Sequence, residues 1–223
     1  MKAFKFMKYD IRRSSRVMLL QILLFAPLAI LMGYNSDVYM VFTYMALVSI
    51  IGPATLFAYE QKSECGFDCM LPAADMDRVA GRFLTGIFFV AIDLILAFIL
   101  AELLIYFNNA KMPDVSVTIL MFVGIVLIYL SISNTIFFAF GRTMNQQIKS
   151  FIIMIPAFIM WGLANGVFTI ISGNDSENDI SSVFMYMLSH KLMLSAIVFC
   201  IGIMAYIMAI IISTAIVKKK DFR

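Results

Sequence analysis

Long apolar runs separated by short polar connections extend through the whole chain. Such runs cross the ~30 Å hydrocarbon core of a bilayer as α-helices when they reach about 17–25 residues. Strand-like alternation is absent, and the runs are far too long for barrel strands. The pattern therefore predicts an all-α, polytopic membrane protein with a single transmembrane domain over residues 1–223 and no soluble domain. The six predicted spans are residues 17–34, 38–59, 83–107, 115–140, 151–171 and 192–217.

The charges outside the spans indicate an orientation. The predicted spans contain no Lys, Arg or His, and all but Lys111 and Lys191 of the 17 Lys and Arg residues fall on the side that holds both termini. Basic residues concentrate on the cytoplasmic side of membrane proteins. Both termini are therefore predicted to be cytoplasmic, which an even number of spans also requires.

The first sixteen residues form more than a plain tail. On a helical wheel Ala3, Phe4, Met7 and Ile11 share one face, and the other face carries basic residues. This pattern predicts an amphipathic helix lying in the cytoplasmic headgroups. A basic anchor that only sets the topology is the simpler alternative.

The connection over residues 60–82 is rich in acids although it is too short for a catalytic domain. Glu60, Glu64 and Asp68 recur at every fourth residue, so a helix would carry them as one stripe. An acidic stripe is repelled by anionic lipid, so the pattern favours contact with a protein partner over contact with the membrane surface. A solvated loop face is the alternative.

Two acids lie inside the third predicted span. Asp93 is roughly 15 Å from the start of the span at 1.5 Å per residue, whereas Glu102 lies near the external end. Asp93 must be protonated, face water or accept hydrogen bonds from groups such as Asn134 or Thr43. An intramembrane acid indicates either a transport-linked role or a structural anchor between helices, and both remain open.

The fifth predicted span contains a pair of small residues at helical spacing. Gly162 and Gly166 form a small-xxx-small surface that suits close packing of helices. The packing could occur within one chain or between two copies.

Composition narrows the possible chemistry. Hydrophobic residues make up 62% of the chain and charged residues 14%, with a mean hydropathy of +0.94, whereas soluble domains are ~45–50% apolar and ~25% charged. A free cytosolic enzyme, a secreted disulfide scaffold and a disordered chain are excluded. The net charge of +3 is not the signature of nucleic-acid binding.

The residue inventory excludes several catalytic sites. The single histidine, His190, lies on the predicted external side, so neither an HExxH motif nor an intramembrane triad can form. Cys65, Cys69 and Cys200 lie at different levels and do not make a zinc site. No G-x-x-x-x-G-K-[ST] motif is present to hold ATP phosphates. We therefore expect no catalytic residues, no metal and no cofactor on this chain.

Residues 56–84 resemble the first cytoplasmic loop of small bacterial permeases of the type-two ABC exporter family. In that family a glutamate follows the second span, and a Leu-Pro turn precedes a Val-x-Gly entry to the third. Glu60, Leu71-Pro72-Ala73 and Val79-Ala80-Gly81-Arg82-Phe83 match this pattern. Ala74-Asp75 stand where the family has Ser-Arg, and Arg78 is near enough to substitute.

The resemblance implies a permease subunit without ATPase activity of its own. The N-terminal helix would be the connecting helix, and the 60–82 loop would carry a coupling helix that docks on a separate ATPase. Two permeases, identical or related, would pair with two ATPases, which would bind ATP and Mg²⁺. The complex would export a peptide or hydrophobic compound across a bacterial plasma membrane. The implied coupling residues are Glu60, Glu64, Asp68, Leu71, Pro72, Asp75, Arg78 and Arg82.

Three other functions fit the same pattern. The chain could be the six-span substrate-binding component of a vitamin importer, which would bind its ligand tightly without a long acidic loop. It could be a proton-coupled carrier that uses Asp93. It could also be a membrane protein of immunity or assembly that transports nothing.

Overall fold

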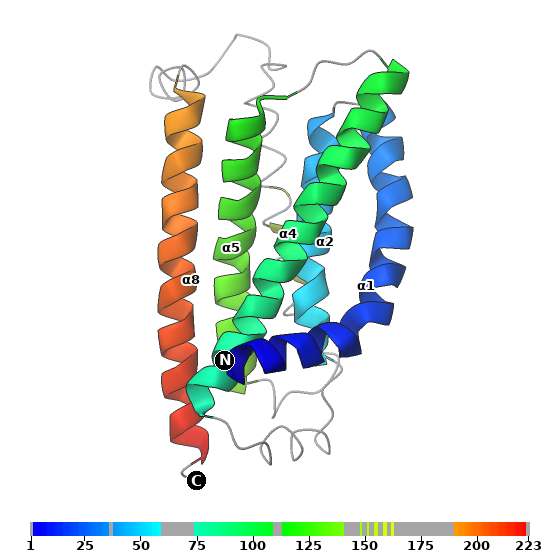
Figure 1. Cartoon of the computed structure of the whole chain (residues 1–223). Helices are drawn as coiled ribbons and strands as arrows, with labels where there is room; N and C mark the ends of the chain where they lie inside the picture. Colours follow the sequence, from blue (N-terminus) through cyan, green and yellow to red (C-terminus); the bar gives the residue numbers. More distant parts are fainter. Residues whose placement is uncertain are drawn as a thin grey trace.

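The computed structural model describes five helices of the chain (Figure 1). The described residues are 2–35, 38–58, 74–108, 113–140 and 190–221, together with single positions between 148 and 162. Over these residues the fold is all-helical, as the apolar pattern predicts. The helices are α1 (Lys2–Asn35), α2 (Tyr39–Ala58), α4 (Asp75–Asn108), α5 (Val115–Phe140) and α8 (Lys191–Asp221).

Among the described residues, three stretches of helix are long and apolar enough to cross a membrane: Asp75–Phe107, Val115–Phe140 and Lys191–Lys219. Two shorter apolar stretches, Ile22–Tyr34 and Tyr39–Pro53, belong to α1 and α2. The fifth predicted span, 151–171, lies largely outside the described residues. The total of six spans therefore stays a prediction.

The helices form an upright bundle whose chain ends lie together. α1 and α4 run toward one end of the bundle, whereas α2, α5 and α8 run toward the other (Figure 1). The N- and C-terminal ends consequently lie at the same end of the bundle (Figure 1). The assignment of that end to the cytoplasm stays a prediction from the basic residues.

α1 joins the predicted amphipathic helix and the first predicted span in one helix. Its first part lies across the end of the bundle, and the rest then turns to run along it (Figure 1). The Ser14 hydroxyl donates to the Asp10 carbonyl at 2.8 Å, and the Ser15 hydroxyl donates to the Arg12 carbonyl at 3.0 Å. Hydroxyls that bond back to the preceding turn bend helices, so this serine pair is a local cause of the turn.

α4 begins at Asp75, well before the predicted membrane entry at Phe83. Its first turn carries Asp75 and Asp77, whose charges stabilise a helix N-terminus. The Ala74 carbonyl accepts the backbone N–H of Asp77 at 2.9 Å. The apolar run marks where hydrocarbon begins, whereas these acids mark where the helix begins. The last part of the predicted 60–82 connection is therefore helix continuous with the span.

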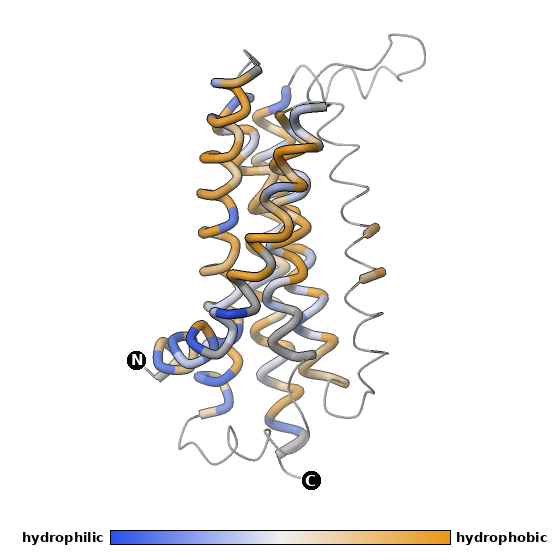
Figure 2. The backbone as a smooth tube through the Cα atoms, turned by 90° about the vertical axis from the view of Figure 1, so that its right-hand side faces the viewer, coloured by the Kyte–Doolittle hydropathy of each residue, from blue (hydrophilic) through white to orange (hydrophobic). Residues whose placement is uncertain are grey.

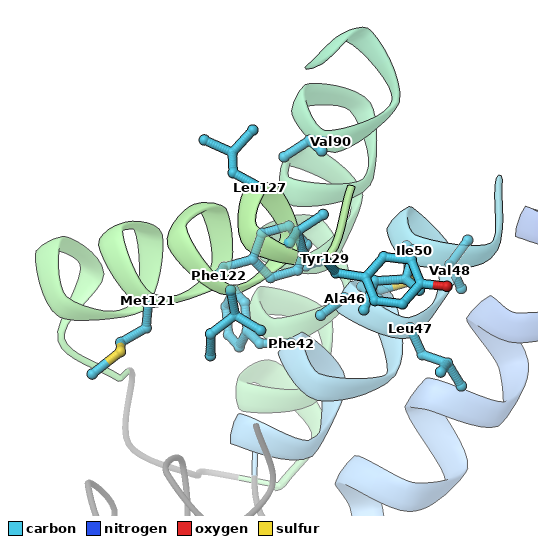
Figure 3. Packing of buried hydrophobic residues seen from close by; sticks show 14 of the residues in the cluster. Phe42, Ala46, Leu47, Val48, Ile50, Val90, Met121, Phe122, Leu127 and Tyr129 are labelled. Carbon is cyan, nitrogen blue, oxygen red and sulfur yellow. The ribbon is translucent and has the colours of Figure 1, made fainter. Parts of the chain in front are cut away.

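The core lies between α2, α4 and α5. Figure 3 shows Phe42 and Ile50 of α2, Val90 of α4, and Phe122 and Tyr129 of α5 gathered there, all buried. The outer surface is apolar as well, and only 22% of the apolar window of α8 is buried inside the protein. An apolar surface of this extent is stable in lipid and not in water.

α8 is attached to α4 and α5 by different contacts. The Tyr206 hydroxyl donates to the Phe83 carbonyl at 2.5 Å, and the two rings meet edge to face at 5.0 Å. On α5, a Cβ added at Gly124 would lie 2.9 Å from the backbone of Phe199. A Cβ added at Gly202 would lie 2.7 Å from the Gly124 carbonyl oxygen. The backbones of α5 and α8 therefore touch at these two glycines.

The glycine pair predicted for helix packing is a different one. Gly162 is exposed, and a Cβ built on it would meet no other helix among the described residues within 4 Å, while Gly166 lies outside those residues. A packing role for Gly162 and Gly166, including packing between two copies, stays a prediction.

Alanine at either contact glycine should destabilise the bundle. We expect Gly124→Ala and Gly202→Ala each to lower the free energy of unfolding by about 1–3 kcal/mol, because the added methyl meets backbone that cannot rotate away. Thermal melts of the purified chain in detergent measure this. Gly162→Ala is the matched control, and it should be neutral or stabilising because helix propensity favours alanine over glycine. Equal melting midpoints for all three variants would contradict the close contact.

Candidate functional site

The base of α4 is covered by the first turns of α1. A Cβ at Gly81 would lie 2.6 Å from the Phe6 Cβ and 3.0 Å from the Ala3 carbonyl oxygen. Glycine is therefore required at this position for the two helices to approach so closely. The sequence resemblance identifies Gly81 only as part of the entry to a span, whereas in the structure the N-terminal segment packs directly against it.

A buried ion pair holds the same two helices together. The Arg82 Nε lies 2.9 Å from the Asp10 Oδ2, and the two side chains are only 11% and 5% exposed. Asp10 was not among the predicted site residues. The signal that could have found it is its charge, because it is the only acid in a basic N-terminal segment. Removing one partner of a buried pair is costly, because the buried charge that remains loses that counter-charge.

The ion pair lies on the face of the N-terminal helix that packs against the bundle. Asp10 and Ser14 are buried, and Ala3 and Phe6 on the same stripe are half-buried. Phe4, a member of the predicted apolar face, lies outside this buried stripe and is 64% exposed, so the predicted contact of that face with the headgroups stays a prediction. Hydropathy predicts only which face of a helix prefers lipid. It does not predict that another face of the same helix packs against protein.

The predicted coupling residues divide into two groups. Asp75, Arg78 and Arg82 lie in the first turns of α4, where the Arg82 side chain is engaged with Asp10. Their role in coupling stays a prediction. The predicted residues that lie outside the described part of the chain are Glu60, Glu64, Asp68, Leu71 and Pro72.

The intramembrane acid has a defined partner. Asp93 is 1% exposed, and its Oδ2 accepts a hydrogen bond of 2.8 Å from the Ser49 hydroxyl. The contact links α4 to α2. Asp93 Oδ1 is buried and has no hydrogen-bond partner among the described residues. The carboxyl therefore combines an interhelical bond with one unsatisfied oxygen.

Neither donor that the sequence suggested for Asp93 provides this bond. The Thr43 hydroxyl donates to the Tyr39 carbonyl in its own helix at 3.1 Å. Asn134 is buried, and within the part of the chain that the structure describes its amide oxygen and nitrogen have no hydrogen-bond partner. Sequence reasoning missed Ser49 because a serine within an apolar run has no local feature that distinguishes it. Glu102 is exposed on α4.

The described residues hold no group of three or more His, Cys, Asp and Glu side chains that could bind a metal. Cys200 is exposed on α8, and Cys65 and Cys69 lie outside the described part. The ion pair and the serine–carboxyl bond described above are therefore contacts between helices, and Asp93 is a buried acid that belongs to no metal-binding cluster of the described residues.

Over the described residues, the long apolar helices are those of a multi-pass membrane protein. The chain belongs to the ABC-2 family of transporters, because residues 3–218 match the model of that family, described as ABC-2 family transporter protein. The match covers nearly the whole chain and confirms the resemblance seen in residues 56–84. The family is the membrane component of such transporters and lacks an ATPase domain, and its members generally pair with an ATPase subunit. No curated protein matches the sequence significantly.

Breaking the ion pair should loosen α1 from α4. We expect Asp10→Ala to cost about 3 kcal/mol, because Arg82 is left charged in a buried position. Thermal melts and limited proteolysis of the N-terminal segment measure this. The charge exchange Asp10→Arg with Arg82→Asp should recover part of the loss, and Lys8→Ala, which removes an exposed charge from the same helix, is the control. A double variant no better than the sum of its single changes would argue against the pairing.

The bond between Ser49 and Asp93 should contribute modestly to stability. We expect Ser49→Ala to lower the free energy of unfolding by about 0.6–1.7 kcal/mol, the range measured for interhelical polar bonds in membranes. Ser131→Ala is the control, because Ser131 is also buried but donates to the Leu127 carbonyl in its own helix. Unfolding in mixed detergent micelles compares the two. A larger loss in the control would contradict an interhelical role for Ser49.

Proposed function

We propose that this chain is the permease subunit of an ATP-driven exporter and couples to a separate ATPase through residues 60–82. The observation that carries the proposal is the continuity of α4. This helix begins within that connection, at Asp75, and runs without a break through the apolar stretch to Asn108. Force applied to the connection would act directly on a membrane helix.

The contacts between α1 and α4 support a movement of these two helices as one rigid unit. At its base α4 is held to α1 by the Asp10–Arg82 pair and by the close approach at Gly81. Near its far end a Cβ on Gly33 of α1 would lie 2.6 Å from the Leu104 Cδ1. A helix of this length extends about 50 Å. Two helices joined at both ends would transmit a displacement of the base across the whole bilayer.

The rest of the proposal follows the pattern of such transporters. Two permeases, identical or related, would pair with two ATPase subunits that bind ATP and Mg²⁺ in a bacterial plasma membrane. The cargo would be a peptide or a hydrophobic compound. The 18 methionines and 21 phenylalanines of the chain suit a soft, adaptable lining for such a cargo, although many of them serve packing and lipid contact.

A proton-coupled carrier is the second candidate, because one observation favours it. Asp93 is buried with one carboxyl oxygen unsatisfied, which is the setting of an acid that gains and loses a proton. Such a carrier would transport without an ATPase, and Asp93→Asn would abolish flux driven by a pH gradient. No comparable observation favours a vitamin-importer component or a protein of immunity or assembly.

Reversing the acidic charge of the connection should weaken the ATPase complex. We expect Glu60→Lys and Glu64→Lys each to reduce the ATPase recovered with the permease at least about threefold, since each reverses an acidic charge of the proposed docking segment. Gentle detergent pull-down from the native membrane with mass spectrometry measures the recovery. Glu177→Lys, on the predicted external side, is the matched control and should recover wild-type amounts.

Two outcomes would overturn parts of the proposal. The exporter assignment would be wrong if no ATPase were recovered with the wild-type chain under conditions that preserve other complexes. Undiminished recovery with both loop variants would remove the docking role of residues 60–82 and leave the exporter assignment standing.

A further inference from the structure

The N-terminal part of α1 carries a row of exposed cations. Lys5, Lys8, Arg12 and Arg16 are all exposed. Their spacing of three or four residues places them on one face of the helix. We call these four residues the cation row.

The contacts with α4 determine which way the cation row points. Asp10 is buried in its pair with Arg82, and Phe6 packs at Gly81. Residues two apart on a helix point about 200° away from each other, so Arg12 points almost opposite to Asp10. The ion pair thus fixes the rotation of the helix about its axis and directs the cation row away from the bundle.

The row lies at the level where the apolar part of the molecule ends. Figure 2 shows hydrophilic residues gathered in the N-terminal segment, beside the lower end of the hydrophobic bundle. The segment runs across the bundle while the apolar part of α1 runs along it (Figure 1). From Arg16 to the apolar stretch that begins at Ile22 is about 9 Å of helix. The cations are therefore close to the boundary between hydrocarbon and headgroups.

Phe4 gives the same segment an apolar contact. Its side chain is 64% exposed, beside the cation row and away from the face that packs on α4. A helix with exposed cations and an exposed aromatic ring at the membrane boundary has the make-up of an interfacial helix. Phosphate oxygens are the acceptors that Lys and Arg side chains bind best at such a boundary.

We propose that the cation row binds the phosphate groups of anionic phospholipids in the leaflet at this end of the bundle. The anionic lipid would hold the outer face of the segment while the Asp10–Arg82 pair holds its inner face. The inference goes beyond the proposed function, because it concerns the lipid around the permease and does not depend on an ATPase.

The test compares lipid selectivity in reconstituted protein. The full chain is placed in phosphatidylcholine discs that contain spin-labelled phosphatidylglycerol or spin-labelled phosphatidylcholine, and the motionally restricted fraction of each lipid is measured. Both leaflets have the same composition, so the orientation of the chain has no effect. We expect the wild-type chain to prefer phosphatidylglycerol by about threefold and about 0.5 M NaCl to reduce that preference, because salt screens exposed charges.

The variants locate the preference on the cation row. Changing Lys5, Lys8, Arg12 and Arg16 together to Gln should reduce the preference to near equality. The pair Lys5→Gln with Lys8→Gln should lose about half of it, and the pair Lys218→Gln with Lys219→Gln is the matched control, since these are exposed lysines at the same end on α8. The control pair should lose clearly less than the N-terminal pair.

Other outcomes would overturn the proposal. A quadruple variant that keeps the wild-type preference would exclude lipid binding by the row, as would equal losses in the two lysine pairs. Loss of a copurifying protein from the quadruple variant with lipid preference unchanged would assign the row to an acidic protein surface instead. If the quadruple variant does not fold, the lysine pairs and the salt dependence of the wild-type chain decide the matter.

Discussion

The absence of water from the bilayer interior is the constraint on which the rest of this structure depends. Backbone groups in hydrocarbon must find partners within the chain, which leaves helices as the form for every described element. The same constraint acts on side chains. The hydroxyls of Thr85, Ser131 and Thr214 donate to carbonyls of their own helices. Helices satisfied in this way offer each other few polar contacts, so the ones that do cross between helices are structurally informative.

Three such contacts converge on α4. Ser49 of α2 bonds to Asp93, the Tyr206 hydroxyl of α8 bonds to the Phe83 carbonyl, and Asp10 of α1 pairs with Arg82. α4 is thus connected by polar contacts to helices on several sides. Because the same helix begins in the connection proposed to meet the ATPase, a displacement of its base would reach all three neighbours. This convergence explains how one short connection could control a whole permease.

The N-terminal segment has two faces that serve different surroundings. Its inner face packs on α4 through Phe6 and Asp10, and its outer face carries the cation row that we propose binds lipid phosphates. A segment of this kind would move with α4 while sliding along the headgroups. In the proposed exporter, the lipid composition of the leaflet would then influence how easily the two helices move.

The sequence by itself determined the class of this protein and most of its helices. The apolar run over 115–140 has the same bounds as α5, because the energy of placing side chains in hydrocarbon is a sum over neighbouring residues and can be read locally. The 56–84 motif, taken together with the predicted six-span architecture, indicated the type-two ABC exporter family, and the match over residues 3–218 confirms the ABC-2 family.

Only the tertiary structure decided which residues meet. The partner of Asp93 is Ser49 rather than Asn134, and the glycines in close contact are Gly124 and Gly202. Arg82, which the sequence assigned to a partner protein, is paired with Asp10 far away in the chain. These pairings depend on the rotation and depth of each helix against its neighbours, which many weak packing contacts determine together. Hydropathy records whether a residue prefers lipid, and it carries no information about the face on which a neighbouring helix will lie.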